Sequence, residues 1–340
     1  MNCKRFAFFS VVLATALVCS AQEMLPKAKP FDPFAKKEGS KLTSTTSFKA
    51  EKKKAEDVFP EEVLKGGVSD FEYILLAPGV EYFKAHVDNL FGKVNNLHVV
   101  RVDFKVANVQ PAIHPNATDA HGKPDGKKLR GASDVAEEYR ALVAVNGGVF
   151  RWKVLKPCYA QKVNGKLIDS EGTRGSGFAF TGKEKLHMGA LNEESLKGYD
   201  NFICGDYVLE NSKCCLGGKR NSNGPAPRSL LGLTPENVLY ILVIDGRQKG
   251  KSLGINYWES ADLMMWFGCR GGFNLDGGGS TTLCIRKKAL KGYKGPSRGT
   301  SASKVKGDVK IMNNPSDGHE RKVLDHFLIL DEHSVLPAKE

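Results

Sequence analysis

The pattern of apolar and polar positions predicts short β-strands more often than helices. Residues 141–145 and 238–244 are apolar or aromatic throughout, which is typical of strands covered on both faces. Residues 97–106 partly alternate apolar and polar side chains, as a strand with one solvated face does. Helical patterns occur at 133–140, where a serine can cap the N-terminus, and at 257–267, where a glycine follows the last turn. Together these elements predict an α+β fold, with a mixed central β-sheet and flanking helices.

The first 60 residues differ from the rest of the chain. Lys4 and Arg5 precede an apolar run at 6–18, and small residues follow as far as Ala21, which is the pattern of a secretory signal peptide. The run is shorter than the roughly 20 residues that span a membrane, so we expect cleavage after Ala21 and no stable membrane insertion. Residues 22–60 are rich in Lys, Pro, Ser and Thr without an apolar period, which predicts a flexible linker. The sequence thus predicts a signal peptide at 1–21, a linker at 22–60 and a single domain at 61–335.

The cysteine content fits an exported protein, which we expect to be secreted or periplasmic. Of the eight cysteines, Cys3 and Cys19 lie in the predicted signal peptide, which leaves six. An even number of cysteines in an oxidising compartment favours disulfide bonds, and their spacing does not match a zinc site. We therefore expect these cysteines to form disulfides, with the adjacent Cys214 and Cys215 bonded to different partners.

Three of the predicted strands end in a polar residue that is followed by glycine. These residues are Asn146, Asp245 and Asp276, and Asp276 precedes three glycines, Gly277–Gly279, and Ser280. Because open sheets bind ligands at strand ends, the three side chains can converge on one site. Glycine amides in a sharp turn can also bind an anion. The alternative is three independent turns, in which Asp276 only stabilises a glycine-rich hairpin.

Several short motifs occur in an order that is specific as a set. They are Leu76–Val80, Asn146–Phe150, Pro227–Ser229, Asp245–Arg247, Leu275–Ser280 and Asn314–Ser316 with Arg321. This order resembles that of the phosphodiester glycosidase family, and the resemblance extends over about residues 77–330. Two positions depart from the family's pattern. Ser229 replaces the usual threonine and keeps its hydroxyl, whereas Asn314 replaces a common arginine and loses its charge.

The resemblance implies an exported hydrolase that cleaves a sugar-1-phosphodiester to free sugar and a phosphomonoester. Such a reaction needs a carboxylate at the oxocarbenium-like centre and cations that hold the phosphate, for which the planar guanidinium of arginine is best suited. Asp276 and Asp245 are the implied catalytic carboxylates, and a nearby arginine is expected to keep Asp276 ionised. The implied substrate-binding residues are Asn146, Arg228, Ser229, Arg247, Gly277, Gly278, Gly279, Ser280 and Asn314.

The net charge of +12 fits an anionic partner, either a sugar phosphodiester or an anionic glycan, and it also fits a merely basic surface. Nucleic acid is not an expected partner, because no binding motif accompanies the charge. For Arg247 an ion pair with a neighbouring aspartate is an alternative to phosphate binding. The sequence does not indicate an oligomeric state. Basic residues soon after the glycine turn can either steer phosphate or form a solvated loop: Lys287, Lys288, Lys291, Lys294 and Arg298.

Two other function classes stay open. In a metal-dependent phosphodiesterase, Asp245, Asp276 and Asn146 would surround Ca²⁺ or Mg²⁺, and the products would include a sugar phosphate. No other cofactor is expected. A non-catalytic envelope-polysaccharide binding protein would bind glycans without turnover. The pair of aspartates at strand ends favours an enzyme, and the products formed from sugar-1-phosphodiesters would distinguish the classes.

Overall fold

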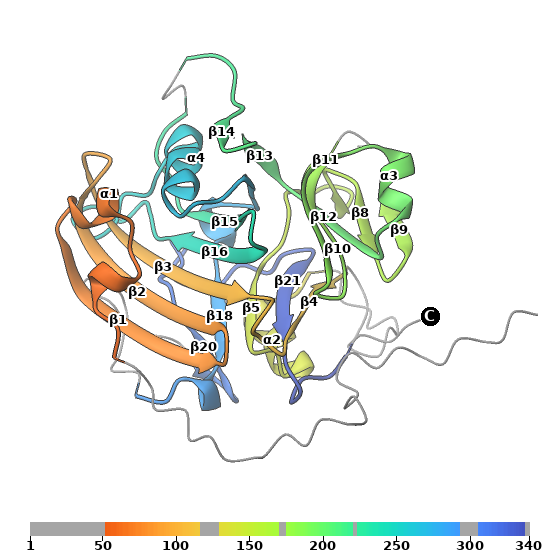
Figure 1. The fold of residues 1–340 in the computed structure, drawn as a ribbon, viewed down its shortest axis with the longest axis horizontal. Helices are drawn as coiled ribbons and strands as arrows, with labels where there is room; N and C mark the ends of the chain where they lie inside the picture. The colour runs from red at the N-terminus through yellow and green to blue at the C-terminus, as the bar shows by residue number, and fades with distance from the viewer. Residues whose placement is uncertain (1–51, 116–128, 170–174, 220–222, 293–304, 337–340) are drawn as a thin grey trace, which may run out of the picture. The chain divides into compact units, whose positions relative to one another are not determined.

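Antiparallel β-strands form most of the protein in its computed structural model, which describes residues 52–115, 129–169, 175–219, 223–292 and 305–336 (Figure 1). The predicted signal peptide, and the predicted linker as far as residue 51, lie outside the described residues and stay predictions. The same holds for Lys294 and Arg298 of the basic segment. Within 52–60, Phe59 is buried, and its ring lies 5.1 Å from that of Phe83 on the domain.

The largest sheet has eight strands in the order β1-β2-β3-β16-β15-β17-β13-β14. Tight turns join neighbouring strands, as at Pro78-Gly79, where Gly79 has a φ of 75° that side chains rarely adopt. β16 is apolar throughout because both of its faces are covered, with Ile241 in one apolar cluster and Leu242 in another. The strands are β1 (Val68–Ala77), β2 (Val80–Leu90), β3 (Lys93–Asp103), β13 (Asp206–Glu210), β14 (Lys213–Cys214), β15 (Arg228–Leu233), β16 (Val238–Ile244) and β17 (Gly271–Asn274).

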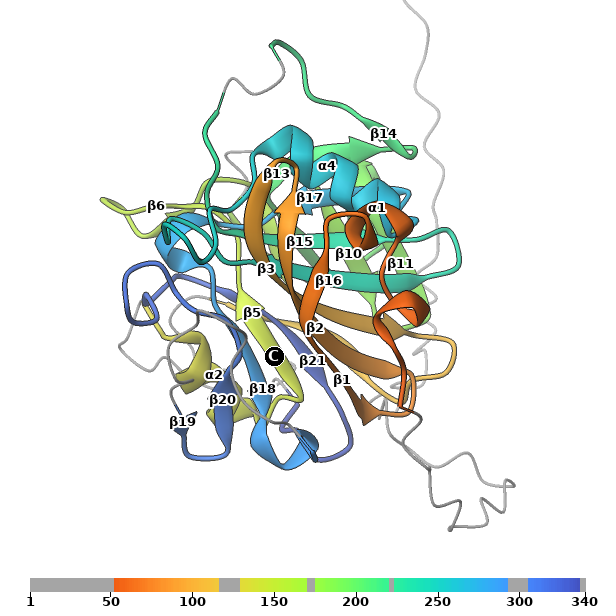
Figure 2. The same ribbon diagram turned by 90° about the vertical axis from the view of Figure 1, so that its left-hand side faces the viewer.

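Helix α4 (Tyr257–Trp266) covers one face of this sheet (Figure 2). Its N-terminus is fixed by a capping box, in which the Asn256 side chain accepts a hydrogen bond from the Glu259 amide at 2.9 Å and the Glu259 carboxylate accepts one from the Asn256 amide at 2.8 Å. Leu263 then packs into the same apolar cluster as Leu230 of β15. The cap therefore sets the position of Tyr257, the first residue of the helix.

A second sheet has six strands in the order β19-β20-β18-β5-β21-β4. Helix α2 (Ala132–Tyr139) packs against one face of this sheet. The other face of the sheet contributes Val145 and Phe327 to the apolar cluster that also contains Ile241 of the larger sheet. The two sheets therefore share one apolar core. The strands are β4 (Gln110–His114), β5 (Val143–Asn146), β18 (Leu283–Arg286), β19 (Val305–Lys306), β20 (Val309–Ile311) and β21 (His326–Leu330).

A third sheet of five strands, in the order β11-β10-β12-β8-β9, is inserted between β7 and β13. The rings of Phe178 and Phe180 pack edge-on against Phe327, at 5.9 and 6.2 Å, and so join this sheet to the shared core. Its elements are β8 (Gln161–Val163), β9 (Lys166–Asp169), β10 (Gly175–Thr181), β11 (Lys185–Leu191), α3 (Glu193–Lys197) and β12 (Asn201–Cys204). The remaining elements are η1 (Ala55–Asp57), α1 (Glu61–Leu64), the β6 (Phe150–Arg151) and β7 (Lys156–Pro157) pair, η2 (Gly278–Ser280) and η3 (Lys287–Ala289).

The α+β prediction is therefore correct only in part. Strands and helices lie close to their predicted positions, with β16 at 238–244 and α2 and α4 within one residue of the predicted bounds. The described helices are few and short, however, and the longest has ten residues. Every strand pair among the described residues is antiparallel, so the predicted mixed sheet is wrong: the protein is mainly β.

The predicted disulfides are not present, since all six cysteines after residue 51 are free thiols in the structure. Cys204, Cys269 and Cys284 are buried in three different apolar clusters, where they pack as small apolar side chains. Burial raises the pKa of each of these thiols. In the part of the chain that the structure describes, no helix is long and apolar enough to cross a membrane.

Candidate functional site

Two of the three strand-end residues lie together, and the third lies elsewhere. The Asn146 amide nitrogen donates a hydrogen bond to the Asp276 carbonyl oxygen at 2.6 Å. The Asp276 amide in turn donates to the carbonyl oxygen of Gly147 at 3.0 Å. These bonds join the end of β5 to the end of β17. Asp245 belongs to a separate group of buried polar residues, so the predicted convergence holds for two of the three strand ends.

Asp276 is partly exposed and its carboxylate is held within its own turn. The Ser280 hydroxyl donates to Asp276 Oδ2 at 2.6 Å. Burial raises the pKa of Asp276, while the bond from Ser280, the charge of Arg321 and the amide of Gly277 act in the opposite direction. The expected effect of a nearby arginine is thus present, in Arg321, but burial outweighs it.

The glycines that follow Asp276 lie close to guanidinium groups, and Gly278 and Gly279 make room for them. Each glycine of the Gly277–Gly279 turn faces a different arginine. A methyl group on the glycine would lie 3.6 Å from Nη1 of Arg228 at Gly277, 3.2 Å from Cζ of Arg247 at Gly278 and 2.5 Å from Cζ of Arg321 at Gly279. Three cations therefore surround one turn, beside the Asp276 carboxylate. Such a site attracts an anion with several oxygens, and planar guanidinium groups fit a phosphate.

Arg228 is the most enclosed of the three arginines. It is 6% exposed, its Nε donates to the Ile255 carbonyl oxygen at 2.9 Å, and its guanidinium stacks 4.1 Å from the centre of the Tyr257 ring. Burial lowers the pKa of Arg228, and the nearby charge of Arg247 acts in the same direction, while Tyr257 and the charge of Asp206 act in the opposite direction. No ion pair links Arg228 to a carboxylate of the described residues. A buried cation without a paired carboxylate is costly unless an anion binds to it.

Arg247 and Arg321 are more accessible. Arg247 is exposed, and its own backbone is left-handed, with a φ of 59°. Within the described ranges it has no ion pair, so the alternative role for Arg247 is not seen there. Arg321 donates from Nη2 to Asp317 at 2.6 Å and lies 5.9 Å from the ring centre of Trp152, which is 52% exposed. The two arginines can therefore adjust to a bound anion.

The backbone amides of the turn are less available than the sequence predicts. The Gly278 amide donates to the Pro227 carbonyl oxygen at 2.9 Å, and the Gly277 amide contributes to the environment of the Asp276 carboxylate. Two of the three backbone amides of the turn are thus already hydrogen-bonded within the protein. Positive charge at this turn comes from the arginine side chains.

Asn146, Ser229 and Ser280 are buried and bonded to the protein. Asn146 is 1% exposed, and its Oδ1 accepts from the Ser229 hydroxyl at 2.7 Å and from the Thr282 amide at 3.1 Å. Ser229 and Ser280 are fully buried, and Ser280 is bonded to Asp276 as described above. These side chains hold the turn in place, and in this geometry they do not face an open surface.

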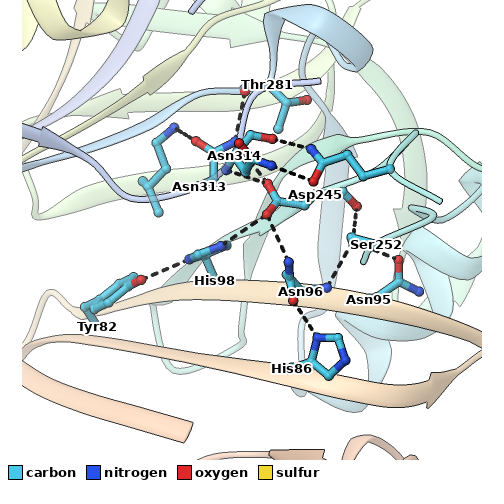
Figure 3. Close-up of polar contacts among 12 residues, drawn as sticks. Tyr82, His86, Asn95, Asn96, His98, Asp245, Ser252, Thr281, Asn313 and Asn314 are labelled. Atoms are coloured by element: carbon cyan, nitrogen blue, oxygen red, sulfur yellow. Dashed lines mark hydrogen bonds and ion pairs between the residues drawn. The ribbon is translucent and has the colours of Figure 1, made fainter. Parts of the chain in front are cut away.

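Asp245 is fully buried in a cluster of polar side chains that includes Asn96, His98, Asn313 and Asn314 (Figure 3). Its Oδ1 accepts from the Asn314 amide at 2.9 Å and from the Asn313 side chain at 3.3 Å. Its Oδ2 accepts from Asn96 at 3.4 Å and lies 3.7 Å from Nε2 of His98. The Asn314 side chain continues outward by donating to Gln248 Oε1 at 2.6 Å. Asp245 and Asn314 therefore join the loop after β20 to the turn that carries Arg247.

Two carboxylates near Asp276 carry no sequence signal of their own. Asp325 is 3% exposed and accepts a hydrogen bond from the Gln161 side-chain nitrogen, while its carbonyl oxygen accepts from the Gly147 amide at 2.8 Å. Burial, and to a smaller extent the charge of Asp276, raises the pKa of Asp325 to about 7. Asp206 begins β13 and pairs in register with Asn274, two residues before Asp276. Neither precedes glycine, so the pattern that identified the strand ends misses both.

No metal site is apparent among the described residues, since no group of three or more His, Cys, Asp or Glu side chains is placed to hold an ion.

Known proteins share both the sequence pattern and the fold. Residues 139–330 match the sequence profile of the family described as phosphodiester glycosidase. An uncharacterized SPbeta prophage-derived protein, YomE of Bacillus subtilis (strain 168), is 34% identical over 103 residues, which are 30% of this chain and 12% of the relative. The match thus spans a small part of that relative.

Three solved structures resemble this one. The zebrafish N-acetylglucosamine-1-phosphodiester alpha-N-acetylglucosaminidase catalytic domain, auto-inhibited by its pro-peptide, has a TM-score of 0.55 at 18% identity and covers 77% of this chain and 88% of its own. A hypothetical protein from Synechocystis has a TM-score of 0.54 at 11% identity, and the match covers 77% of this chain and 64% of that protein. A Burkholderia pseudomallei K96243 protein described as exported has a TM-score of 0.51 at 12% identity, and the match covers 78% of this chain and 97% of that protein.

These likenesses show a shared fold. The family match includes Asn146 and the arginine-lined turn, a name we use for Gly277–Gly279 with Asp276 before it and Arg228, Arg247 and Arg321 around it. On the length of that match, the chain belongs to the phosphodiester glycosidase family.

Proposed function

We propose that the protein hydrolyses a sugar-1-phosphodiester to free sugar and a phosphomonoester, and that it does so outside the cytoplasm. The observation that carries the proposal is Arg228, a buried guanidinium with no ion-paired carboxylate among the described residues, beside the partly exposed Asp276. A phosphodiester is an anion of the right shape for a guanidinium fork. The carboxylate next to it is the group that glycoside cleavage requires.

In the proposed complex the phosphodiester oxygens bind Arg228, Arg247 and Arg321, which all face the Gly277–Gly279 turn. The bond from the anomeric carbon to the phosphate oxygen breaks, and its electron pair leaves with the phosphate. This leaving group needs little protonation, because the arginines stabilise its charge. Asp276, ionised, stabilises the oxocarbenium-like centre. Water then supplies the new oxygen at the anomeric carbon, and the proton that this water loses ends on the released phosphomonoester.

The other predicted site residues take supporting roles in this proposal. Ser280 orients the Asp276 carboxylate, and Asn146 with Ser229 fixes the backbone on which Asp276 sits. Asp245 supports the Arg247 turn through Asn314, and it does not touch the substrate. Asp276 is therefore the single reacting carboxylate that we propose.

The test is product identification from a panel of sugar-1-phosphodiesters, with an N-acetylglucosamine diester first because the zebrafish relative's name specifies that bond. We expect a free reducing sugar and a phosphomonoester, with turnover that persists in chelator. Release of a sugar phosphate would instead show P–O cleavage, and loss of activity in chelator would assign the site to a metal-dependent phosphodiesterase. Tight glycan binding without any product would leave a binding protein.

Export is the second part of the proposal, and it rests on the sequence pattern of residues 1–21. N-terminal sequencing of protein recovered outside the cytoplasm should find a chain that begins near Gln22. An intact Met1 on such protein would contradict this part alone.

A further inference from the structure

The Asp206 carboxylate is held on both of its oxygens by tyrosine hydroxyls. Tyr159 donates to Oδ1 at 2.6 Å and Tyr257 donates to Oδ2 at 2.6 Å. The three residues come from different parts of the fold: the segment before β8, the first position of β13 and the first turn of α4. All three residues are partly exposed. The carboxylate is thus fixed in orientation in a residue that is not fully buried.

This carboxylate belongs to the same site as the arginine-lined turn. Asp206 pairs in register with Asn274, two residues before Asp276. Tyr257, which holds Asp206, also carries the guanidinium of Arg228 at 4.1 Å from its ring centre. The charge of Asp206 contributes to raising the pKa of Asp276. Tyr257 therefore contacts both Arg228, the proposed phosphate-binding arginine, and the Asp206 carboxylate, close to Asp276.

The tyrosines leave part of the carboxylate's bonding capacity unused. An ionised carboxylate offers about four lone-pair positions on its two oxygens, and the tyrosine hydroxyls occupy one on each oxygen. The described residues donate no further side-chain hydrogen bond to Asp206. One acceptor position on each oxygen then has no donor among the described side chains, and two such positions on one carboxylate suit two hydroxyl groups on neighbouring carbon atoms. Two neighbouring hydroxyls are the recurring feature of a sugar ring.

We propose that Asp206, held by Tyr159 and Tyr257, binds two neighbouring hydroxyl groups of the sugar ring and thereby determines which sugar the protein accepts. The identity of the ligand as a sugar phosphate rests on the proposed function. The binding itself does not need turnover. A bidentate carboxylate distinguishes sugars by the position and orientation of adjacent hydroxyls, while the arginines hold the phosphate that all substrates share.

The experiment measures binding by calorimetry, with α-glucose 1-phosphate, α-N-acetylglucosamine 1-phosphate and their 3-deoxy, 4-deoxy and 6-deoxy analogues as probes. Inorganic phosphate reports on the arginines alone. The variants are Asp206→Asn, Tyr159→Phe and, as a matched control at the exposed far end of the same strand, Glu210→Gln. Thermal melting confirms that each variant is folded.

For the wild type we expect removal of either of two adjacent hydroxyls to weaken binding on the order of 10-fold, as for a hydrogen bond to a charged group, and removal of the third to have little effect. In Asp206→Asn the discrimination should fall to about twofold or less, while affinity for inorganic phosphate stays unchanged. Tyr159→Phe should give an intermediate result, because Asp206 loses one of its two supports. Glu210→Gln should behave as the wild type does.

Three outcomes would overturn the inference. The first is full discrimination in Asp206→Asn. The second is an equal loss of affinity for sugar phosphate and inorganic phosphate in that variant, which would make Asp206 only a support for Tyr257 beneath Arg228. The wild type could also bind the 1-phosphates no more tightly than inorganic phosphate. Discrimination that depends on Asp206 without any hydrolysis would keep this inference and reject the proposed glycosidase.

Discussion

Asp245 and Asp276 have the same sequence context and opposite surroundings. Each follows a buried apolar strand and precedes glycine. Asp245 is fully buried, with Asn314 and Asn313 at one oxygen and Asn96 at the other. Asp276 is partly exposed and faces arginines. An aspartate whose oxygens are all occupied by protein donors stabilises the fold, whereas one that faces cations and open space can take part in a reaction.

The difference comes from what lies beside each strand end. Both strands are inner strands of the large sheet, but Asp245 at the end of β16 lies beside Asn96 and His98 of the neighbouring β3, and the side chain of Asn313 also reaches it. β17 ends beside β5, at a turn whose glycines leave space for guanidinium groups. The neighbours of a strand end, more than its own motif, decide its role.

Asp276→Asn should show the largest effect on activity. The amide nearly preserves volume and can still accept from Ser280, so the variant should fold. It loses the negative charge that stabilises the oxocarbenium-like centre, and turnover should fall on the order of 10²-fold or more. Kinetics and thermal melting on one preparation test this. An unfolded variant would assign Asp276 to the turn, and a folded, fully active one would exclude it from the chemistry.

Asp245→Asn should show the converse, a loss of stability with little loss of activity per folded molecule. Both carboxylate oxygens of Asp245 accept hydrogen bonds from N–H groups. In the variant a side-chain NH2 group replaces one of these oxygens, so buried N–H donors lose their acceptor. The free energy of unfolding should fall by roughly 2 kcal/mol, measured by urea denaturation. A stable variant with turnover reduced as far as in Asp276→Asn would make Asp245 the reacting carboxylate instead.

Arg228→Lys tests the cation side of the comparison. Lysine keeps the charge but loses the planar fork and the stacking on Tyr257, so kcat/KM should fall by about 10-fold. Arg101→Lys is the matched control, since Arg101 is paired with Asp103 at 3.3 Å on the surface of β3. Equal effects of the two substitutions would remove Arg228 from the phosphate site.

The sequence predicted elements better than it predicted the site. Apolar runs identified β16 and the ends of the strands, because burial on both faces leaves a continuous apolar segment. The shared position at a strand end before glycine placed Asn146 and Asp276 together correctly. It could not show that Asp245 is closed in, because the donor that reaches it from β3, Asn96, lies 149 residues away in sequence. Such long-range contacts leave no local pattern.

The same reason explains the residues that were missed. Asp206 has no motif around it, and its partners Tyr159 and Tyr257 lie 47 and 51 residues away in sequence. Asp325 precedes β21 instead of following a strand, so the search for polar residues at strand ends passes over it. Both carboxylates become visible only when the inserted sheet and the two larger sheets are assembled.

The smallest expected effect is a dependence of kcat/KM on pH. It extends the comparison of Asp245 and Asp276 to a third carboxyl group, that of Asp325. Burial holds Asp325 neutral below its pKa of about 7. Above that pH its ionisation places a second negative charge near Asp276, which weakens binding of an anionic phosphodiester. We expect kcat/KM to fall roughly threefold as pH rises through 7, and Asp325→Asn to abolish this fall.

Stability should change in the same pH range, because the folded pKa of Asp325 is raised above the value of 3.8 that an unperturbed aspartate has. A group with a raised folded pKa stabilises the fold fully below its unfolded pKa, and that contribution is lost as pH rises through the folded pKa. The melting temperature of the wild type should therefore decrease relative to that of Asp325→Asn as pH rises from 3.8 to about 7, and change little above that pH. Asp317→Asn, which removes an exposed carboxylate from Arg321, provides the control. Parallel pH profiles for wild type and Asp325→Asn would show that Asp325 does not titrate in this range, and the carboxylate beside Asp276 would then be ionised throughout.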